Sequence, residues 1–233
     1  MLSFIKRLLP HHSEAIFTLS KEERNNFCRE LIDSSSLKSE FYFLLIVSIF
    51  ITMAGLLNNS VILIIGGMLV APLLSPILSM SLAIVIRNGH VAWRAIRIFL
   101  ITTILALLVS TLIGSVFSFK TSEMEMIEKI GINGFDILIA ALAGAAASLT
   151  WAKKNLSNNL AGVAITVTLL PPLVLAGIGL AALDYYIFID ALKTYLLNVG
   201  GIIIGSLIIF IILKFQEARK KVIADVAEAD KER

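Results

Sequence analysis

Long apolar segments are the feature of this sequence that most restricts its fold. They are separated by polar or charged breaks and occupy residues 41–57, 60–86, 98–118, 135–152, 159–183 and 195–213. A helix of about 20 mainly apolar residues crosses the hydrocarbon core of a bilayer. Apolar residues make up 58% of the chain and charged residues only 16%, which is far from a soluble composition. The sequence therefore predicts an all-α polytopic membrane protein with six transmembrane helices.

Basic residues alternate between the breaks and predict the orientation. They lie in the N-terminal segment, in the 87–97 loop, at Lys153 and Lys154, and in the tail after residue 213. Cytoplasmic loops carry an excess of Lys and Arg. We therefore expect a protein of the plasma membrane with both termini in the cytoplasm. The net charge of +3 is explained by these flanking residues, and no nucleic-acid partner is expected.

The breaks divide the chain into five parts. We expect a cytoplasmic amphipathic N-terminal segment, a first three-helix repeat, an extracytoplasmic loop, a second three-helix repeat and a charged cytoplasmic tail. Their bounds are 1–40, 41–119, 120–134, 135–213 and 214–233.

The N-terminal segment contains a predicted helix of its own. Ser20 and Glu23 have the spacing of a capping box, and a helical stripe of apolar residues follows it. The stripe consists of Phe27, Cys28, Leu31 and Ile32. This helix could lie on the membrane surface or against the spans. Cys28, the single cysteine, is expected to be a reduced thiol.

The two halves of the apolar region resemble each other. A shift of one hundred residues aligns Asn58-Asn59 with Asn158-Asn159 and Pro72-Leu73 with Pro172-Leu173. Each half contains three spans, an odd number, so a duplicated half would be inserted in the opposite orientation. The sequence thus predicts two inverted three-helix repeats.

Prolines interrupt the second and the fifth segment. Proline inside a helix removes a hydrogen bond and leaves carbonyl groups unpaired, which a bilayer tolerates only where protein or water covers them. Broken helices at matching places in inverted repeats are the sequence pattern of a transport pathway. The alternative is that the prolines merely kink two helices and nearby hydroxyl groups satisfy the freed carbonyls. The candidate pathway residues are Asn59, Ser60, Gly66, Gly67, Pro72, Ser75, Pro76, Thr166, Thr168, Pro171, Pro172 and Asn198.

Few side chains in the apolar segments could do chemistry. Asp136 is the one carboxylate close to a span interior, and it could bind a coupling ion or simply face the positive end of its helix. The three histidines lie in polar segments. We therefore expect no metal site, no cofactor and no enzymatic activity.

Small residues recur at helical spacing in two segments. Gly201 and Gly205 form a Gly-x-x-x-Gly motif, and Ala140, Gly144 and Ser148 repeat a small residue every four positions. Such faces allow helices to approach closely, either between subunits or within one. Since six helices enclose little space, we expect a homo-oligomer.

Several motifs together resemble one family. Residues 55–60 (GLLNNS) and 65–77 (IGGMLVAPLLSPI) carry the resemblance in the first half, and 136–146, 162–165, 170–173 and Asn198 carry it in the second. The sequence is similar to the domain of unknown function 389 family, hydrophobic membrane proteins of bacteria and archaea whose activity is not established. The resemblance implies a membrane fold and no particular reaction.

These residues bear on three functions. A transporter or channel for a small solute or ion, with its pathway at the two proline breaks, fits the architecture best. The alternative is a non-transporting structural or lipid-interacting membrane protein that acts through its N-terminal helix. An enzyme acting on lipids fits least, because no nucleophile and base lie at a recognisable spacing.

Overall fold

The computed structural model describes residues 19–34, 39–117, 134–153 and 168–218, and within these ranges the fold is all-helical. The described residues form eight α-helices and one 3-10 helix and contain no strand. The helices are α2 (Lys21–Ser34), α3 (Ser39–Leu57), α4 (Val61–Val70), α5 (Leu74–Val85), α6 (Gly89–Phe117), α7 (Gly134–Ala152), α9 (Leu170–Ala181) and α10 (Tyr185–Ile212), followed by η4 (Phe215–Ala218). This confirms the predicted all-α class.

Four of these helices are long and apolar enough to cross a membrane. They are α3, α6, α7 and α10, and α4 and α5 pass the same criterion together as one bent pair. The fifth expected segment is represented by α9, which has only 12 residues; residues 154–167, which precede it, lie outside the described part of the chain. The structure therefore describes four candidate spans, or five when the bent pair counts as one.

The first proline break is confirmed. Helix α4 ends at Val70, α5 begins at Leu74, and the two are bent by 53° around Pro72. Pro76 is the third residue of α5. The first N–H groups of a helix have no partner within it, so a proline in the first turn sacrifices no hydrogen bond.

The second pair of prolines lies at the start of a described helix. Pro171 and Pro172 are the second and third residues of α9, and the rest of the expected broken span, residues 159–167, lies outside the described residues. The fixed φ of proline suits the first turn of a helix, and its missing N–H would have been unpaired there. The prolines thus mark a helix start, where their missing N–H groups leave fewer backbone donors without a hydrogen-bond partner.

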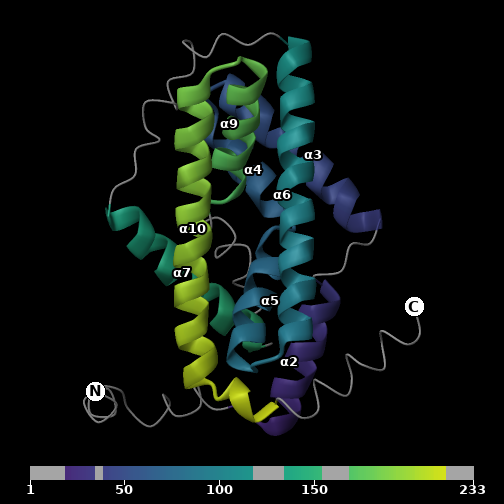
Figure 1. Ribbon diagram of the computed structural model, residues 1–233, viewed down its shortest axis with the longest axis vertical. Coiled ribbons are helices and arrows are strands. Elements are labelled where there is room, and N and C mark those ends of the chain that lie inside the picture. Colours follow the sequence, from purple (N-terminus) through teal and green to yellow (C-terminus); the bar gives the residue numbers. More distant parts are fainter. Residues whose placement is uncertain (1–18, 35–38, 118–133, 154–167, 219–233) are drawn as a thin grey trace.

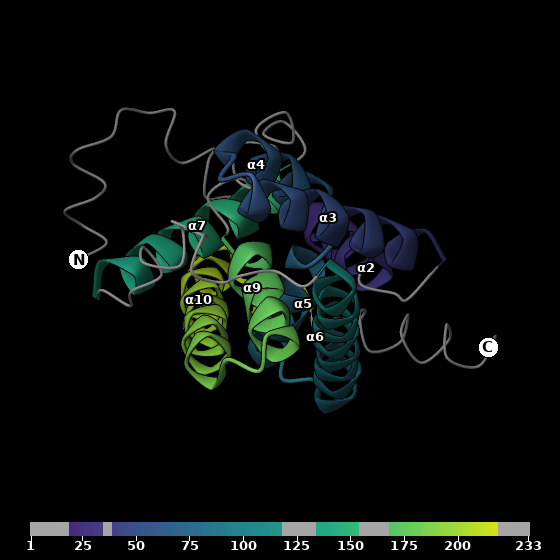
Figure 2. The ribbon, with the colours of Figure 1, turned by 90° about the horizontal axis from the view of Figure 1, so that it is seen from above.

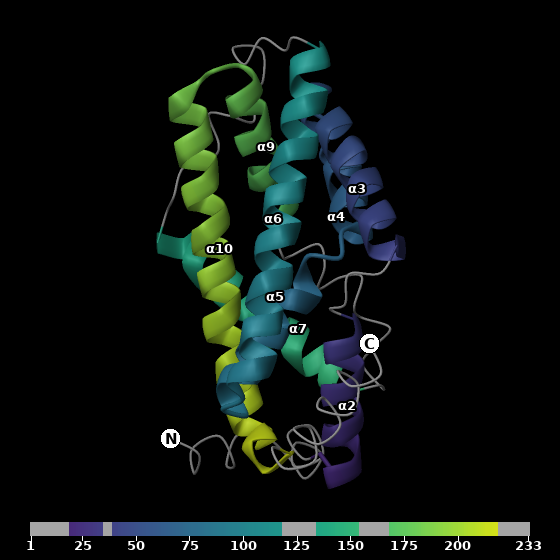
Figure 3. The same cartoon turned by 45° about the vertical axis from the view of Figure 1, so that its right-hand side comes forward.

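The centre of the molecule is formed by two long and two short helices (Figure 1). The long helices α6 and α10 run in opposite directions along the vertical axis, with α9 beside them in the upper half and α5 in the lower half. Figure 3 shows the same order. Close contacts of Gly177 with Ser110 and of Gly114 with Ala181 fix α9 along the second half of α6. Helices α5 and α9 therefore both start near mid-height and run apart.

Corresponding helices have matching lengths. Helices α5 and α9 have 12 residues each and begin 96 positions apart, as do α6 and α10, which have 29 and 28 residues. Helices α3 and α7 have 19 residues each. The described helices after the prolines therefore correspond at a shift of 96, where the sequence suggested 100. Pro172 is matched by Pro76, not by Pro72.

The α5–α6 and α9–α10 corners have the same hydrogen bonds. The N–H of Asn88 donates to the Ala83 carbonyl at 3.1 Å, and the N–H of Asp184 donates to the Gly179 carbonyl at 2.9 Å. Arg87 and Leu183 adopt left-handed backbone angles, with φ of 51° and 55°, as residues after a helix end often do. Asn88 and Asp184 then cap α6 and α10. These caps start both helices earlier than the expected spans at 98 and 195.

Helices α3 and α7 cross the central group obliquely (Figure 2). The predicted small-residue motifs meet at the seam between α7 and α10. A Cβ on Gly201 would lie 2.7 Å from that of Ala140, and one on Gly144 would meet the Ile202 backbone. The two motifs therefore pack against each other within one chain. The homo-oligomer stays a prediction, without these motifs as its support.

Helix α2 lies against the lower end of the helical group. Its capping box is confirmed, since the Ser20 N–H donates to Glu23 Oε2 at 2.7 Å and the Glu23 N–H donates to Ser20 Oγ at 3.1 Å. Phe27, Cys28 and Leu31 are buried, while the side chain of Ile32 is outside the described part. Of the two predicted placements, on the membrane surface or against the spans, the structure shows the second.

An ion pair between buried Arg24 and exposed Glu217, together with an aromatic cluster, holds α2 in place. Arg24 Nη1 lies 2.8 Å from Glu217 Oε2 and donates to the Lys214 carbonyl at 2.9 Å. The ring of Phe27 lies 5.6 Å from that of Phe210 and 4.9 Å from that of Phe215. Burial raises the pKa of the Cys28 thiol to about 12, which disfavours the reactive thiolate. The reduced state of this thiol stays a prediction.

Candidate functional site

The candidate site lies where α5 and α9 begin, between α6 and α10. Pro72, Ser75 and Pro76 from the first predicted set surround the start of α5, and Thr168, Pro171 and Pro172 from the second surround the start of α9. Ser75 is 6% exposed, and its hydroxyl lies 3.5 Å from the Pro72 carbonyl, which is too long for a strong hydrogen bond. The two breaks thus approach the same level of the central group.

Asn198 connects the middle of α10 to the start of α9. The side chain is 5% exposed, and its Nδ2 donates to the Thr168 carbonyl at 2.8 Å and to Thr168 Oγ1 at 3.2 Å. A carbonyl freed at a helix break is costly in an apolar medium unless it finds a donor. Asn198 supplies that donor for the Thr168 carbonyl.

Two of the predicted residues lie at the other end of α4. Asn59, with φ of 49°, and Ser60 form the α3–α4 corner. Ten helical residues separate this corner from the break, which corresponds to about 15 Å. Ser60 makes no side-chain cap bond to α4. The structure therefore does not bring these two residues to the break.

Gly66 and Gly67 serve the packing of α3 on α4. A Cβ on Gly67 would lie 2.9 Å from the Ser48 carbonyl and closer still to Thr52 Oγ1. Thr52 is fully buried, and its hydroxyl has no hydrogen-bond partner among the described residues. Gly66 faces Ile51 at 3.8 Å. The glycines thus allow α3 of the same chain to approach α4 closely.

The predicted carboxylate Asp136 is not at the breaks. Asp136 lies in the first turn of α7, which starts at the outer edge of the molecule (Figure 1). An acidic residue there interacts favourably with the positive end of the helix. Thr166 lies outside the described residues. Both interpretations of Asp136, as a coupling carboxylate and as a partner of the helix dipole, stay predictions.

Sequence reasoning missed a set of buried hydroxyl groups in the central helices. Ser81 and Ser206 are fully buried, and their Oγ atoms lie 3.0 Å apart. Thr103 Oγ1 lies 2.8 Å from the Tyr195 hydroxyl, and the Tyr195 ring stacks on Phe99 at 6.1 Å. A shift of 96 would have paired Ser110 with Ser206, two fully buried serines. The matches at a shift of 100 concealed this pair.

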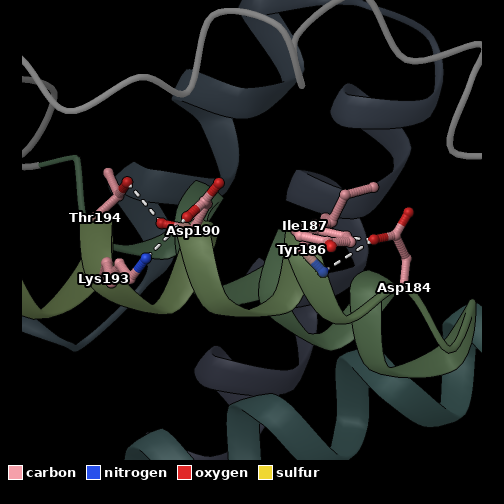
Figure 4. A network of polar contacts seen from close by, with 6 residues as sticks. All are labelled: Asp184, Tyr186, Ile187, Asp190, Lys193 and Thr194. Carbon is pink, nitrogen blue, oxygen red and sulfur yellow. Dashed lines mark hydrogen bonds and ion pairs between the residues drawn. The ribbon is translucent and has the colours of Figure 1, made fainter.

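Charged side chains lie away from this centre. Asp184 accepts from the N–H groups of Tyr186 and Ile187 at the upper end of α10, and Asp190 pairs with Lys193 at 3.2 Å (Figure 4). Among the described residues of α5, α6, α9 and α10, no acidic or basic side chain is buried. Three or more potential metal ligands are nowhere grouped in the described part of the chain. The site therefore offers hydroxyl, amide and backbone groups.

Comparison with known families agrees with the predicted resemblance. The family model described as a domain of unknown function (DUF389) matches residues 68–204. The chain belongs to this family. The matched DUF389 region begins in α4 and ends in α10, so it contains both proline breaks and Asn198.

A curated relative in the archaeon Methanocaldococcus jannaschii is the uncharacterized protein MJ0678. It is 30% identical over 195 residues, which are 82% of this chain and 61% of the relative. The chain thus spans about three fifths of the length of that relative. No solved structure matches.

Proposed function

We propose that this DUF389 protein is a membrane transporter or channel for a small solute or ion, and that its pathway runs through the region where α5 and α9 begin. The observation that supports this most is the arrangement of these two helices. Both have 12 residues, both start at prolines, and they run apart from mid-height between α6 and α10. Discontinuous helices that start inside the membrane form the substrate sites of many transporters.

The proposal includes two inverted repeats of three spans each. Its support is the correspondence of α3, α5 and α6 with α7, α9 and α10 in length, and the opposite directions of α6 and α10. In this arrangement the fifth span contains α9 together with the residues before it. Lipid surrounds the outer faces of α3, α6 and α7, which carry many exposed apolar side chains.

The chemistry of the centre favours some substrates over others. Each helix start carries a partial positive charge of about half an elementary charge. Two such ends near the same level disfavour a cation and favour a neutral solute or an anion. The buried groups nearby are hydroxyls and the Asn198 amide. A small polar molecule that exchanges hydrogen bonds with such groups fits this lining.

The orientation follows from the positions of basic residues. Arg24 contacts Lys214, Lys153 lies beside α2, and Arg87 precedes α6 at the same lower end of the molecule. An excess of Lys and Arg marks the cytoplasmic side. We propose that this end and both termini face the cytoplasm of a cell whose plasma membrane holds the protein.

Flux measurements on proteoliposomes test the transport proposal. Neutral solutes, anions and cations are screened with the full-length chain, and the conducted class is then measured for Asn198→Ala. Losing the donor to Thr168 is expected to lower flux about tenfold, because a hydrogen bond of roughly 1.4 kcal/mol corresponds to that factor. Ser115→Ala is the control, since the Ser115 hydroxyl is exposed and bonds to the Leu112 carbonyl of its own helix.

Absence of flux for every class would contradict the proposal, and equal flux for both variants would move the pathway elsewhere. Labelling of single cysteines in a Cys28→Ala background tests the orientation. Positions 94, 153 and 214 are expected on one side and positions 59 and 183 on the other. Labelling of 94 and 153 from opposite sides would refute the inverted arrangement.

The competing function is a structural or lipid-interacting role of the N-terminal helix. The fold restricts which face of this helix could bind a partner. The apolar face of α2 is covered by the chain itself, so a partner would have to bind the polar face. Deleting residues 1–38 would uncover Phe210 and Ser79 and disturb the fold. Substituting the exposed residues Glu22 and Arg29 is therefore the better test, and unchanged partner recovery would dismiss this role.

A further inference from the structure

A cavity of about 210 Å³ lies between α2 and the end of α7. Helix α2 contributes Glu23, Asn26, Phe27 and Glu30, and α7 ends in the wall with Trp151 and Ala152, followed by Lys153. About 10–15 Å³ of such space suffices for one water molecule. The cavity is therefore large enough for several waters, or for a small polar group with two charged ends.

The walls differ in character from the base to the rim. Phe27 and Ala152 are buried and form an apolar base, and Trp151 is half-buried beside them. Glu23, Asn26 and Glu30 are exposed and lie nearer the rim, and Lys153 also lines the cavity. A cavity lined by carboxylates, an ammonium group and an aromatic ring is suited to a ligand that carries both charges.

The carboxylate of Glu23 is ionised at neutral pH. Hydrogen bonds from the backbone and hydroxyl groups of Ser20 hold its pKa below the usual range, with a smaller contribution from the charge of Lys153. Because one of its oxygens already accepts from Ser20, Glu23 also maintains the capping box. Glu30 takes no part in the capping box, so a substitution there tests the acidic residues of the cavity without removing that cap.

The position of the cavity at the end of a candidate span indicates where such a ligand would come from. Helix α7 is a candidate span from Phe135 to Ala152, so Trp151 and Lys153 mark its end. Tryptophan and lysine are typical of the level at which lipid head groups lie. This step depends on the membrane orientation given under the proposed function, but not on transport.

We propose that this cavity binds a zwitterionic amine and phosphate group, such as the head group of phosphatidylethanolamine. The ammonium lies between Glu30 and the face of Trp151, and the phosphate lies toward Lys153 and the Asn26 amide. The same chemistry occurs in free phosphoethanolamine, so the source is decided by experiment.

Binding is measured on the full-length chain in non-ionic detergent through the emission of Trp151. The chain has two tryptophans, and the Trp93→Phe substitution leaves Trp151 as the only one. Short-chain phosphatidylethanolamine, short-chain phosphatidylglycerol and free phosphoethanolamine are titrated separately. A saturable response is expected for phosphatidylethanolamine, and a response about tenfold weaker for phosphatidylglycerol, which lacks the ammonium.

Matched variants separate the site from a general effect of lipid. Glu30→Gln and Lys153→Gln are each expected to weaken binding of phosphatidylethanolamine about tenfold, with unchanged helical content. Glu22→Gln, an exposed glutamate of the same helix that does not line the cavity, is expected to bind as the parent does. Equally tight binding of free phosphoethanolamine would support the site and identify a soluble ligand.

Equal responses to both lipids, or unchanged affinity in Glu30→Gln and Lys153→Gln, would overturn the proposal. Since binding in detergent requires no transport, a failure of the flux assay would leave this result unaffected. Conversely, flux without head-group binding would refute the cavity proposal alone.

Discussion

Helices α6 and α10 begin at the same type of corner but are covered differently. On α10, Gly201 and Gly205 lie against α7 so closely that a Cβ on either would collide with its backbone or its Ala140 side chain. The positions 96 residues earlier in α6 are Leu105 and Val109. Of the most apolar stretch of each helix, 44% is buried in α10 and only 22% in α6. Glycine placement decides which of two similar helices acquires a close neighbour.

In the first half of the chain, the close contact is made by a different pair of helices. Helix α3 packs on α4, where Gly67 meets Ser48 and Thr52, whereas α7 packs on α10. Two units with the same helix lengths are therefore joined by different seams. This difference leaves the outer face of α6, with Leu108 and Leu112 exposed, to lipid or to another subunit.

The largest effect is expected at the α7–α10 seam. In Gly205→Ala the new methyl group would lie 2.7 Å from the carbonyl carbon of Ala141 and 2.9 Å from the backbone nitrogen of Ala145. Overpacking costs about 1–3 kcal/mol, and rigid backbone atoms place this case at the upper end. Gly200→Ala, with nothing within 4 Å, is the control and is expected to gain up to about 1 kcal/mol. Thermal unfolding in detergent measures both, and equal melting temperatures would show that the seam does not exist.

A second prediction compares corresponding contacts of the short helices. Gly177 of α9 lies against Ser110 of α6, whereas α5 has Ser81 at the matching position, bonded to Ser206 of α10 at 3.0 Å. Gly177→Ala would place its Cβ 2.6 Å from that of Ser110 and is expected to destabilise by about 1–3 kcal/mol. Adding Ser110→Gly should restore part of the loss, because it removes that Cβ. A double-mutant cycle with no coupling would argue against this contact.

The third prediction concerns the caps of the two long helices. Asn88→Ala and Asp184→Ala each remove an oxygen that accepts from two backbone N–H groups. Each is expected to cost about 1 kcal/mol of unfolding free energy. If the corners are equivalent, the two losses agree closely, and Asn58→Ala, which removes no cap, has a smaller effect. A large difference between the two caps would break the equivalence of the corners.

The features that depend on local chemistry could be predicted from the sequence. Helix class, the break at Pro72 and the Ser20–Glu23 capping box follow from apolar periodicity, proline geometry and short-range hydrogen bonds, and the structure has all of them. Asn198 stands out in the sequence because an amide in an apolar helix needs a partner, which proves to be Thr168.

Features that depend on packing between distant helices could not be predicted in the same way. Whether Gly201 and Gly205 face another subunit or α7 is decided by a tertiary contact, and one sequence is compatible with both solutions. Ser60 belongs to the same apolar segment as the break at Pro72, but the ten residues of α4 separate Ser60 from that break. A shift of 100 aligns the Asn-Asn and proline pairs, while the helix bounds correspond at 96.

The smallest expected effect tests the left-handed residue of each corner. Leu183, with φ of 55° and 92% exposed, gains nothing from packing, and a side chain in this conformation costs about 1–2 kcal/mol. Leu183→Gly relieves that cost but adds backbone entropy to the unfolded chain worth about 0.5–1 kcal/mol, so a net gain of up to about 1 kcal/mol is expected. Asn59→Gly should gain less, because asparagine tolerates the left-handed region, and Arg87→Gly should resemble Leu183→Gly if their corners are equivalent. A clearly different change in melting temperature for Leu183→Gly and for Arg87→Gly would show that their two corners are strained differently and that their shared hydrogen bonds do not define one structural unit.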